Sequence, residues 1–179
     1  RINAIPSQHV FVNRGGVLPR KPPLISSTDN ENSWVMPKDI TAGDIIKESN
    51  WIVETAVAEH VQPYLDSIAY KISFDNFSIV FTGDTQPCES VTKLAENADI
   101  MVCMCWDDQE SMDKYQESTG QCSAEGAAKM AKDANVKKLV LSHMGKHIST
   151  HGVLENALGN AAKIYDGEII FAEELMKIQ

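Results

Sequence analysis

Two side chains suited to binding a metal ion follow predicted buried strands. Asp84 comes after the apolar run 77–81 and a glycine, and His143 comes after the apolar run 138–141. A carboxylate at the rim of a sheet needs a partner for its charge, and a metal ion is one such partner. Neutral imidazole is a common metal ligand, and a strand end holds it rigidly. A metal site is therefore one interpretation of these two positions, and a helix-capping aspartate and an ordinary loop histidine are the others.

The other histidines carry weaker signals when each is taken alone. His60 ends the strand-like stretch 57–59, where it is a further candidate ligand. His147 and His151 flank the loop after His143, and their spacing of four places them on one face only in a helix, which residues 148–150 do not favour. We predict a substrate contact for His147 and a structural role for His9.

The elements that must position these residues alternate along the second half of the chain. The apolar patterns predict strands at 51–57, 99–105, 138–141 and 168–171, a β-hairpin at 67–81, helices at 89–96, 123–134 and 152–165, and an exposed loop or short helix at 107–120. Such alternation is typical of an α/β layered domain, which we place at residues 39–179. Residues 1–38 hold most of the prolines and are predicted to be a loop-rich linking segment with a short strand at 9–12.

Composition narrows the classes of partner. The 179 residues carry a formal net charge of −9, and an acidic surface repels phosphate backbones, so nucleic acid is not the expected partner. The chain lacks an apolar run of the roughly 20 residues that a membrane helix needs, and it lacks a signal-peptide profile at its start. The four cysteines form no CxxC pair and are expected to be buried thiols rather than metal or redox groups. We therefore expect a cytoplasmic protein without membrane contact.

Six short motifs, taken in order, resemble a known family. The chain is similar to the C-terminal half of the metallo-β-lactamase superfamily, and most similar to the branch containing ribonuclease Z and the arylsulfatase-like and lactonase-like hydrolases. The motifs are Ala42-Gly43-Asp44, Glu59-His60-Val61-Gln62-Pro63-Tyr64, Ala69-Tyr70-Lys71-Ile72, Phe81-Thr82-Gly83-Asp84-Thr85, Asn97-Ala98-Asp99-Ile100 and Lys138-Leu139-Val140-Leu141-Ser142-His143.

The resemblance implies both a fold and a chemistry. The fold is an αββα sandwich of which this chain is the C-terminal half. The chemistry is hydrolysis by a metal-bound hydroxide at a binuclear centre holding two Zn²⁺ ions, with Mn²⁺ or Fe²⁺ as alternatives. Asp84 would bridge the two metals and act in catalysis, while His60 and His143 would each complete one metal site.

One departure from the family concerns its strongest signature. The His-x-His-x-Asp-His motif, which belongs to the N-terminal half and supplies most of the ligands, does not occur in this sequence. We therefore read Arg1 as the start of a fragment and expect an N-terminal half, from the same gene or a separate chain, as the necessary partner. A degenerate, metal-free domain is the alternative. A homo-oligomer is the expected assembly.

A second departure bears on the substrate. Ribonuclease Z-like sequences carry a glutamate and a histidine where Met104 and Gln121 stand here. Loss of this acid/base pair, together with the acidic charge, leads us to predict a small ester, sulfate ester or lactone as substrate. Trp106, Met104 and the loop 107–122 are predicted to contact it, with core packing as the alternative for Trp106. The rival readings are a phosphodiesterase with ribonuclease Z-like action on RNA, and a metal-free binding domain of the same fold.

Overall fold

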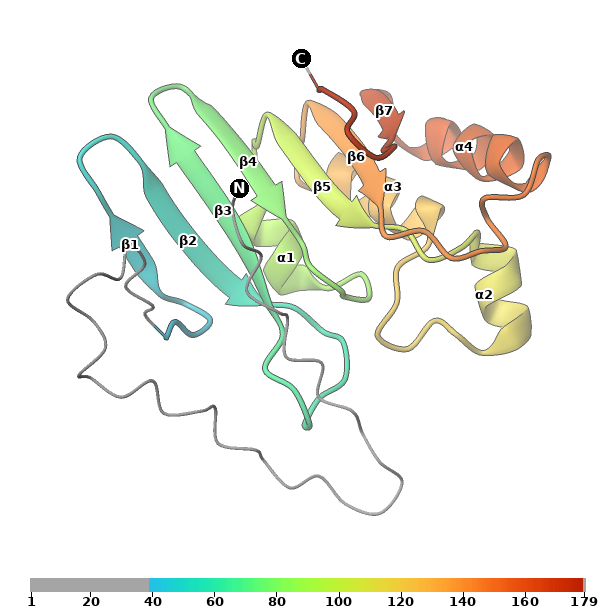
Figure 1. Ribbon diagram of the computed structural model, residues 1–179, viewed down its shortest axis with the longest axis horizontal. Coiled ribbons are helices and arrows are strands. Elements are labelled where there is room, and N and C mark those ends of the chain that lie inside the picture. Colours follow the sequence, from blue (N-terminus) through green and yellow to red (C-terminus); the bar gives the residue numbers. More distant parts are fainter. Residues whose placement is uncertain (1–38, 179) are drawn as a thin grey trace. The chain divides into compact units, whose positions relative to one another are not determined.

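The structure, a computed structural model, describes residues 39–178, which form one mixed sheet and four helices (Figure 1). The predicted linking segment 1–38, with its short strand at 9–12 and His9, lies outside the described residues. None of the helices in 39–178 has the length and apolar character needed to cross a bilayer.

The sheet has seven strands that lie side by side in the order in which they occur along the chain. Strands β1 to β4 pair antiparallel, and β4 to β7 pair parallel. The predicted hairpin is present, with a turn at Asp75 (φ 50°) and Phe74 paired with Phe77. The first strand was not predicted, since three residues are too few to show a period. The strands are β1 (Ile45–Lys47), β2 (Ile52–Val57), β3 (Ile68–Phe74), β4 (Phe77–Phe81), β5 (Ile100–Met104), β6 (Lys138–Ser142) and β7 (Glu168–Phe171).

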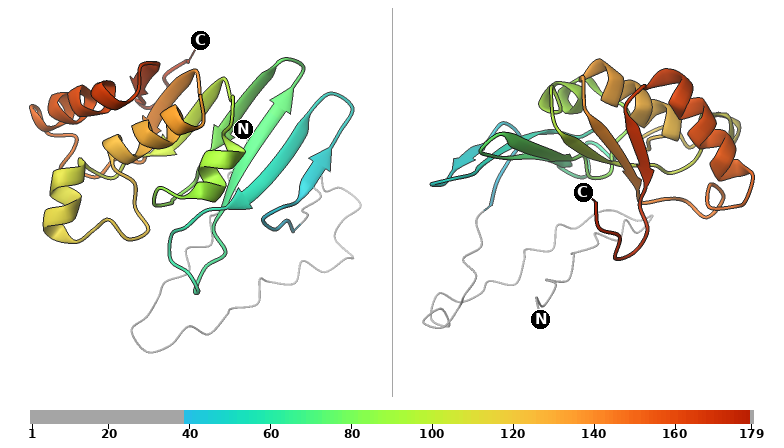
Figure 2. Two further views of the ribbon diagram at one scale, coloured as in Figure 1. Left: turned by 180° about the vertical axis from the view of Figure 1, so that it is seen from behind. Right: turned by 90° about the horizontal axis from the view of Figure 1, so that it is seen from above.

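Side-chain caps and apolar stripes define the helices. The four are α1 (Glu89–Leu94), α2 (Gln109–Tyr115), α3 (Ala124–Asp133) and α4 (Val153–Ile164). The Ser123 hydroxyl accepts a hydrogen bond from the amide of Gly126 and begins α3, as its sequence position predicted. The segment 107–120 contains the short helix α2, and α1 ends at Leu94 rather than at the predicted Glu96. Helices α1, α3 and α4 lie on one face of the sheet (Figure 2).

The hydrophobic core lies between this helical layer and the sheet. Val80, Met101 and Leu139 project from β4, β5 and β6 into it and are fully buried. Alanines of α3 and α4 meet them, and small side chains allow the helices to approach the sheet and each other closely. The four cysteine thiols are free and buried, which confirms the expectation that they are buried.

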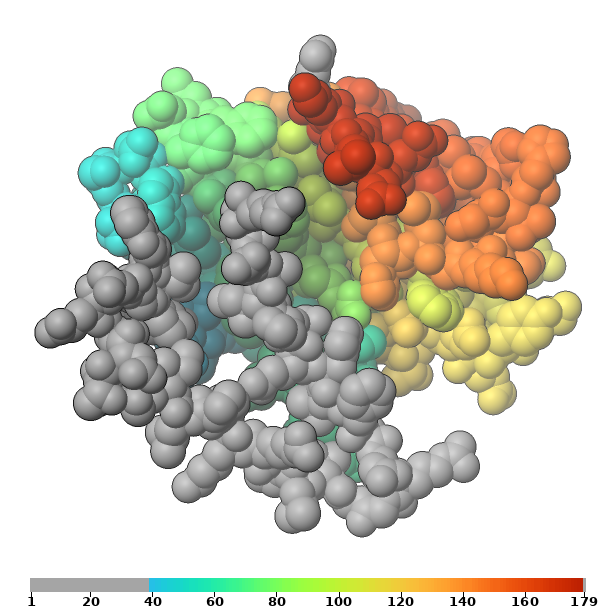
Figure 3. Space-filling model, viewed as in Figure 1, coloured from blue at the N-terminus to red at the C-terminus, as the bar shows by residue number. Residues whose placement is uncertain are grey.

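The opposite face of the sheet is apolar as well. Val80 projects toward the helices. Because side chains alternate along a strand, its neighbour Phe81 projects to the opposite face. Phe81 is 40% exposed and Phe74 is 44% exposed. None of the four described helices lies on this face, which is turned toward the viewer in Figure 1 and in the space-filling view of Figure 3. One sheet with helices on a single face is the half-sandwich that was predicted.

Candidate metal centre

Sheet topology brings the predicted site residues to one edge. Strands β2 and β4 are both antiparallel to β3, and β4, β5 and β6 are parallel, so β2, β4, β5 and β6 all run in the same direction. Their carboxyl ends therefore meet along one edge of the sheet, the lower edge in Figure 1. His60 follows β2, Asp84 follows β4, Trp106 follows β5 and His143 follows β6. Residues far apart in the sequence become neighbours for this reason.

The three predicted metal ligands lie together, with Asp84 in the middle. Its Oδ2 atom is 3.9 Å from Nε2 of His60, and its Oδ1 atom is 3.6 Å from Nε2 of His143. Two ligands about 2.1 Å from a tetrahedral zinc ion lie roughly 3.4 Å apart, close to both separations. Each carboxylate oxygen thus forms, with one imidazole, a pair of donors suited to one ion. The three side chains therefore offer donor atoms that fit divalent metal ions.

Buried hydroxyl groups fix the backbone on both sides of Asp84. Thr82 and Thr85 are fully buried. The Thr82 hydroxyl accepts a hydrogen bond from the amide of Met104 at 3.3 Å, and the Thr85 hydroxyl accepts one from the amide of Glu59 at 2.9 Å. The turn carrying Asp84 is therefore tied to β5 on one side and to the residue before His60 on the other.

The imidazole of His60 is held in the tautomer that a metal ligand needs. Its Nδ1 atom is 2.7 Å from the carbonyl oxygen of Gly120. A carbonyl oxygen can only accept, so Nδ1 carries a proton, and in the neutral imidazole the lone pair therefore lies on Nε2, on the side of Asp84. A ligating histidine typically donates its other ring N–H to a carbonyl or carboxylate in this way.

His143 occupies a strained position beside Trp106. Its backbone has φ 55°, a left-handed conformation that non-glycine residues seldom adopt and that occurs preferentially at functional sites. The Trp106 ring lies 6.3 Å from the His143 ring, centroid to centroid, and the Trp106 carbonyl accepts the amide of Gly145 at 2.8 Å. Trp106 is partly buried and also packs against the core. Its predicted contact with substrate stays a prediction.

Ribonuclease Z-like sequences carry an acid/base pair where this chain has Met104 and Gln121. The surroundings of these two side chains differ. Met104 is 3% exposed, and its sulfur accepts the amide of Thr85 at 2.9 Å, directly beside Asp84 in the chain. Gln121 follows the residue that holds His60, and its Oε1 atom is buried without a hydrogen-bond partner among the described residues. Neither side chain can deliver a proton as a carboxylic acid would.

His147 belongs to a different cluster from the three predicted ligands. Its Nδ1 atom is 2.9 Å from Oδ2 of Asp107, which is nearly buried, and 3.9 Å from Oδ2 of Asp108. The hydrogen bond to Asp107, reinforced by both negative charges, raises the pKa of His147 above its usual value. These three residues also bring their ligand atoms within 4.8 Å of one another.

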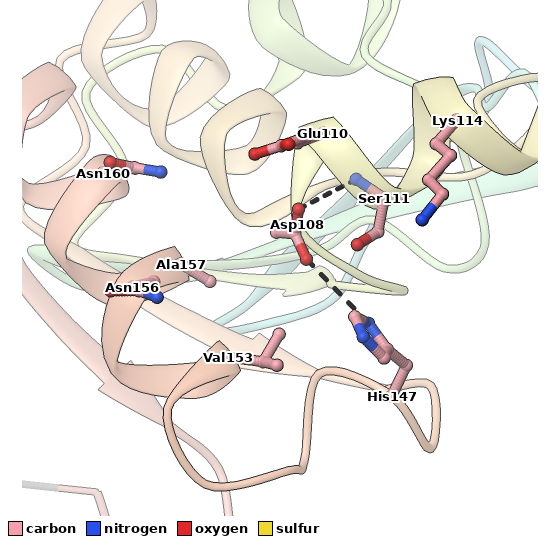
Figure 4. Close-up of a pocket in the computed structure, with 9 residues that line it drawn as sticks. All are labelled: Asp108, Glu110, Ser111, Lys114, His147, Val153, Asn156, Ala157 and Asn160. Atoms are coloured by element: carbon pink, nitrogen blue, oxygen red, sulfur yellow. Dashed lines mark hydrogen bonds and ion pairs between the residues drawn. The ribbon is translucent and has the colours of Figure 1, made fainter.

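The His147 cluster borders a polar pocket of about 270 Å³ (Figure 4). None of His60, Asp84 and His143 lines this pocket, so the substrate contact predicted for His147 stays a prediction. The lining residues are Asp108, Glu110, Ser111, Lys114, His147, Val153, Asn156, Ala157 and Asn160.

A mixed sheet covered by helices on one face, with histidines and an aspartate at the carboxyl ends of its strands, is the arrangement expected for the metallo-β-lactamase fold. The signature of the Beta-lactamase superfamily domain matches residues 20–144, which is more than half of the chain. The chain belongs to this superfamily, and the predicted family and fold are both confirmed.

Sequence relatives of the chain include ribonucleases. The chain is 35% identical over 101 residues to ribonuclease Z of Methanothermobacter thermautotrophicus, a match covering 56% of this chain and 31% of that protein. It is 42% identical over 71 residues to ribonuclease BN of Proteus mirabilis, covering 40% of this chain and 23% of that protein. The chain thus spans about a third or less of the length of these relatives.

Solved structures share the fold. The metallo-β-lactamase fold protein YhfI of Bacillus subtilis superposes with a TM-score of 0.62 at 22% identity, over 75% of this chain and 52% of that one. The short form of human tRNase Z superposes with a TM-score of 0.54 at 22% identity, over 75% of this chain and 44% of that one. At this level of identity the likeness concerns the fold alone.

Proposed function

We propose that the complete protein is a metal-dependent phosphodiesterase with ribonuclease Z-like activity. The observation that carries the proposal is the position of the Asp84 carboxylate, whose two oxygens face the Nε2 atoms of two different histidines. The sequence alone favoured a small ester, sulfate ester or lactone and kept the phosphodiesterase as a rival. The similarity to ribonucleases Z and BN supports the rival reading better.

Each residue of the site has a distinct part in this proposal. His60, Asp84 and His143 would hold two divalent ions, for which zinc is the first candidate and manganese or iron the alternatives. When bound, such ions lower the pKa of water and polarise the bond under attack. The Gly120 carbonyl accepts Nδ1–H of His60, which places the lone pair of the neutral imidazole on Nε2, and the threonines around Asp84 hold its carboxylate between the two imidazoles. Trp106, beside His143, offers an aromatic surface to a substrate base or ring.

The remaining ligands must come from elsewhere in the complete protein. Three side chains do not fill two zinc sites, since each zinc ion takes about four ligands. We propose that an N-terminal half bearing the His-x-His-x-Asp-His motif supplies the others and covers the apolar sheet face. The exposed Phe74, Phe77 and Phe81 support this, because neighbouring exposed aromatic side chains on one sheet face are typical of a surface that another part of a protein covers.

A small ester or sulfate ester stays a second candidate substrate because position 104 carries a methionine, which is not an acid. A thioether cannot protonate a leaving group, so hydrolysis would favour substrates whose leaving groups depart without an acid. The net charge of −9 also weakens the attraction of a long RNA.

Metal analysis combined with a substrate panel tests these proposals. The complete protein is purified, its zinc, manganese and iron are counted, and its rates are compared on bis(p-nitrophenyl) phosphate, a 3′-extended tRNA, p-nitrophenyl acetate, p-nitrophenyl sulfate and a lactone. We expect two metal ions per protein and phosphodiester cleavage that a chelator abolishes. Faster turnover of the carboxylate ester, the sulfate ester or the lactone would favour the second candidate. Fewer than one metal ion per protein, with unchanged stability in chelator, would favour a metal-free binding domain.

We also propose a cytoplasmic location. The four cysteines are free thiols, which is the usual state of cysteines in a reducing compartment. Fractionation of cells that express the complete protein tests this, and recovery in a secreted or periplasmic fraction would contradict it.

A further inference from the structure

The side chain of Gln86 connects the two segments that hold His60. Its Oε1 atom accepts the amide of Gly120 at 2.9 Å, and its Nε2 group donates to Oε2 of Glu59 at 2.8 Å. The backbone reinforces the second connection, because the Gln86 amide donates to the Glu59 carbonyl at 2.7 Å. Gln86 therefore lies between the residue that precedes His60 and the residue whose carbonyl accepts Nδ1–H of His60.

Gly120 makes an unusually close backbone contact in this network. It has φ 75°, and a Cβ atom at this position would collide with the backbone carbonyl oxygen of His60. The glycine is buried, so its amide needs a partner, and the Gln86 side chain supplies it. With the amide fixed on one side, the carbonyl of the same residue is directed at the His60 ring.

We propose that Gln86 is a positioning residue for His60, acting through Gly120. The proposal rests on the proposed metal site, in which Nε2 of His60 is a ligand. Without the side-chain amide of Gln86, the backbone amide of Gly120 loses its hydrogen-bond acceptor. The Gly120 carbonyl, which accepts Nδ1–H of His60, then moves away from the imidazole. The imidazole then exchanges between tautomers, and the form with a proton on Nε2 cannot bind a metal through that atom.

The hydrogen-bond directions allow a matched exchange of side chains. Gln86→Ala removes both connections. Gln86→Glu keeps an acceptor for the Gly120 amide but places a second carboxylate against Glu59. The double variant Glu59→Gln/Gln86→Glu restores both connections with the same net charge, because the new amide at 59 donates to the new carboxylate at 86 while that carboxylate still accepts from Gly120.

Two measurements on the complete protein test the proposal. The first is zinc affinity by competition with a chelator. We expect a loss of about 10- to 100-fold for Gln86→Ala, a smaller loss for Gln86→Glu because it keeps the acceptor for the Gly120 amide, and zinc affinity within about 3-fold of wild type for the double variant. The second is the tautomer of His60 from ¹⁵N chemical shifts of the metal-free protein. We expect protonated Nδ1 in the wild type and the double variant, and a mixture in Gln86→Ala.

The tautomer measurement separates failure of this proposal from failure of the metal site. If the wild type binds no zinc, the proposed function is wrong, while the ¹⁵N shifts still decide whether Gln86 sets the tautomer. An unchanged tautomer and an unchanged zinc affinity in Gln86→Ala would overturn the positioning role. If Gln86→Ala does not fold, the double variant decides, because a folded double variant that has lost zinc affinity more than 10-fold would overturn it as well.

Discussion

The carboxylate of Asp84 lies between the imidazoles of His60 and His143, 3.9 Å from one Nε2 atom and 3.6 Å from the other. Both separations are too long for hydrogen bonds and close to those of two ligands that share a metal ion. A carboxylate that only capped a helix would direct an oxygen at a backbone amide instead. The geometry therefore favours the metal-site interpretation of Asp84 over the capping interpretation that the sequence left open.

Replacement of Asp84 by asparagine should remove metal and activity together. A neutral amide cannot offset the charge of two divalent ions, so we expect metal content to fall to half or less, and phosphodiester turnover to fall by more than about 100-fold. Elemental analysis and initial rates on the complete protein measure both. Asp166→Asn is the matched control, since Asp166 is exposed and precedes β7 at the opposite edge of the sheet. Full metal content in Asp84→Asn would exclude the bridging role.

Introducing the missing acid/base pair should raise activity toward poor leaving groups. In Met104→Glu/Gln121→His the new carboxyl replaces the sulfur that now accepts the Thr85 amide, beside Asp84. General acid catalysis commonly contributes about 10²–10⁴-fold, so we expect a gain of roughly 100-fold on alkyl phosphodiesters and little on nitrophenyl esters. The same pair in an Asp84→Asn background should give no gain. Equal effects on both kinds of leaving group would contradict a proton-donor role.

Local sequence patterns were sufficient to predict most of the elements. The alternation of Ile68, Tyr70 and Ile72 with small or polar neighbours predicted β3, and the position of Ser123 before an alanine stripe predicted the start of α3. These signals lie within a few residues of the structure that they specify. Strand β1 has only three residues and is stabilised mainly by pairing with β2, so its own sequence carries too little information.

The candidate site depended on contacts that no local pattern records. The residues around His60 indicated a ligand only weakly, and the family resemblance was needed to predict it. The approach of His60 to Asp84 follows from the order of β2, β3 and β4 and from the pairing of Glu59 with Gln86, which local sequence does not show. Gln86 and Gly120 were not singled out, because a glutamine after a turn and a glycine in a polar loop are common. Their role depends on hydrogen bonds across 34 residues from Gly120 to Gln86 and 60 residues from His60 to Gly120.

Replacement of Gly120 by alanine should destabilise the fold and weaken metal binding. The left-handed conformation alone costs about 1–2 kcal/mol for a residue with a Cβ atom, and the collision with the His60 carbonyl adds to this. Urea unfolding measures the loss, and chelator competition measures zinc affinity. The control is Gly159→Ala in α4, where a Cβ atom meets nothing within 4 Å and alanine should stabilise the helix by about 0.5–1 kcal/mol. Equal stability changes in the two variants would contradict the proposed close contact.

The four cysteines should be unreactive in the folded protein. All four are buried, and burial raises the pKa of the Cys105 thiol well above its usual range. A hydrogen bond with Cys103, together with burial, raises the pKa of Cys122 as well. Since the thiolate is the reactive form, we expect fewer than one thiol per chain to react with a disulfide reagent at pH 8, and all four after unfolding in guanidinium. Rapid labelling of the native protein would show that at least one thiol is accessible.

The ion pair between His147 and Asp107 should make the loop after His143 sensitive to pH. The hydrogen bond to Asp107 raises the pKa of His147 above 6.5 in the folded protein. Stabilisation from a raised histidine pKa is fully present below the unfolded value of about 6.5 and is lost as the pH rises through the folded value. NMR titration of His147 measures the shift, and hydrogen exchange of residues 144–150 measures the loss of protection. Asp107→Asn should return the pKa toward 6.5 and remove the pH dependence, whereas Asp108→Asn should do less because its oxygen lies 3.9 Å away. A titration of His147 that Asp107→Asn leaves unchanged would show that the pair does not control this loop.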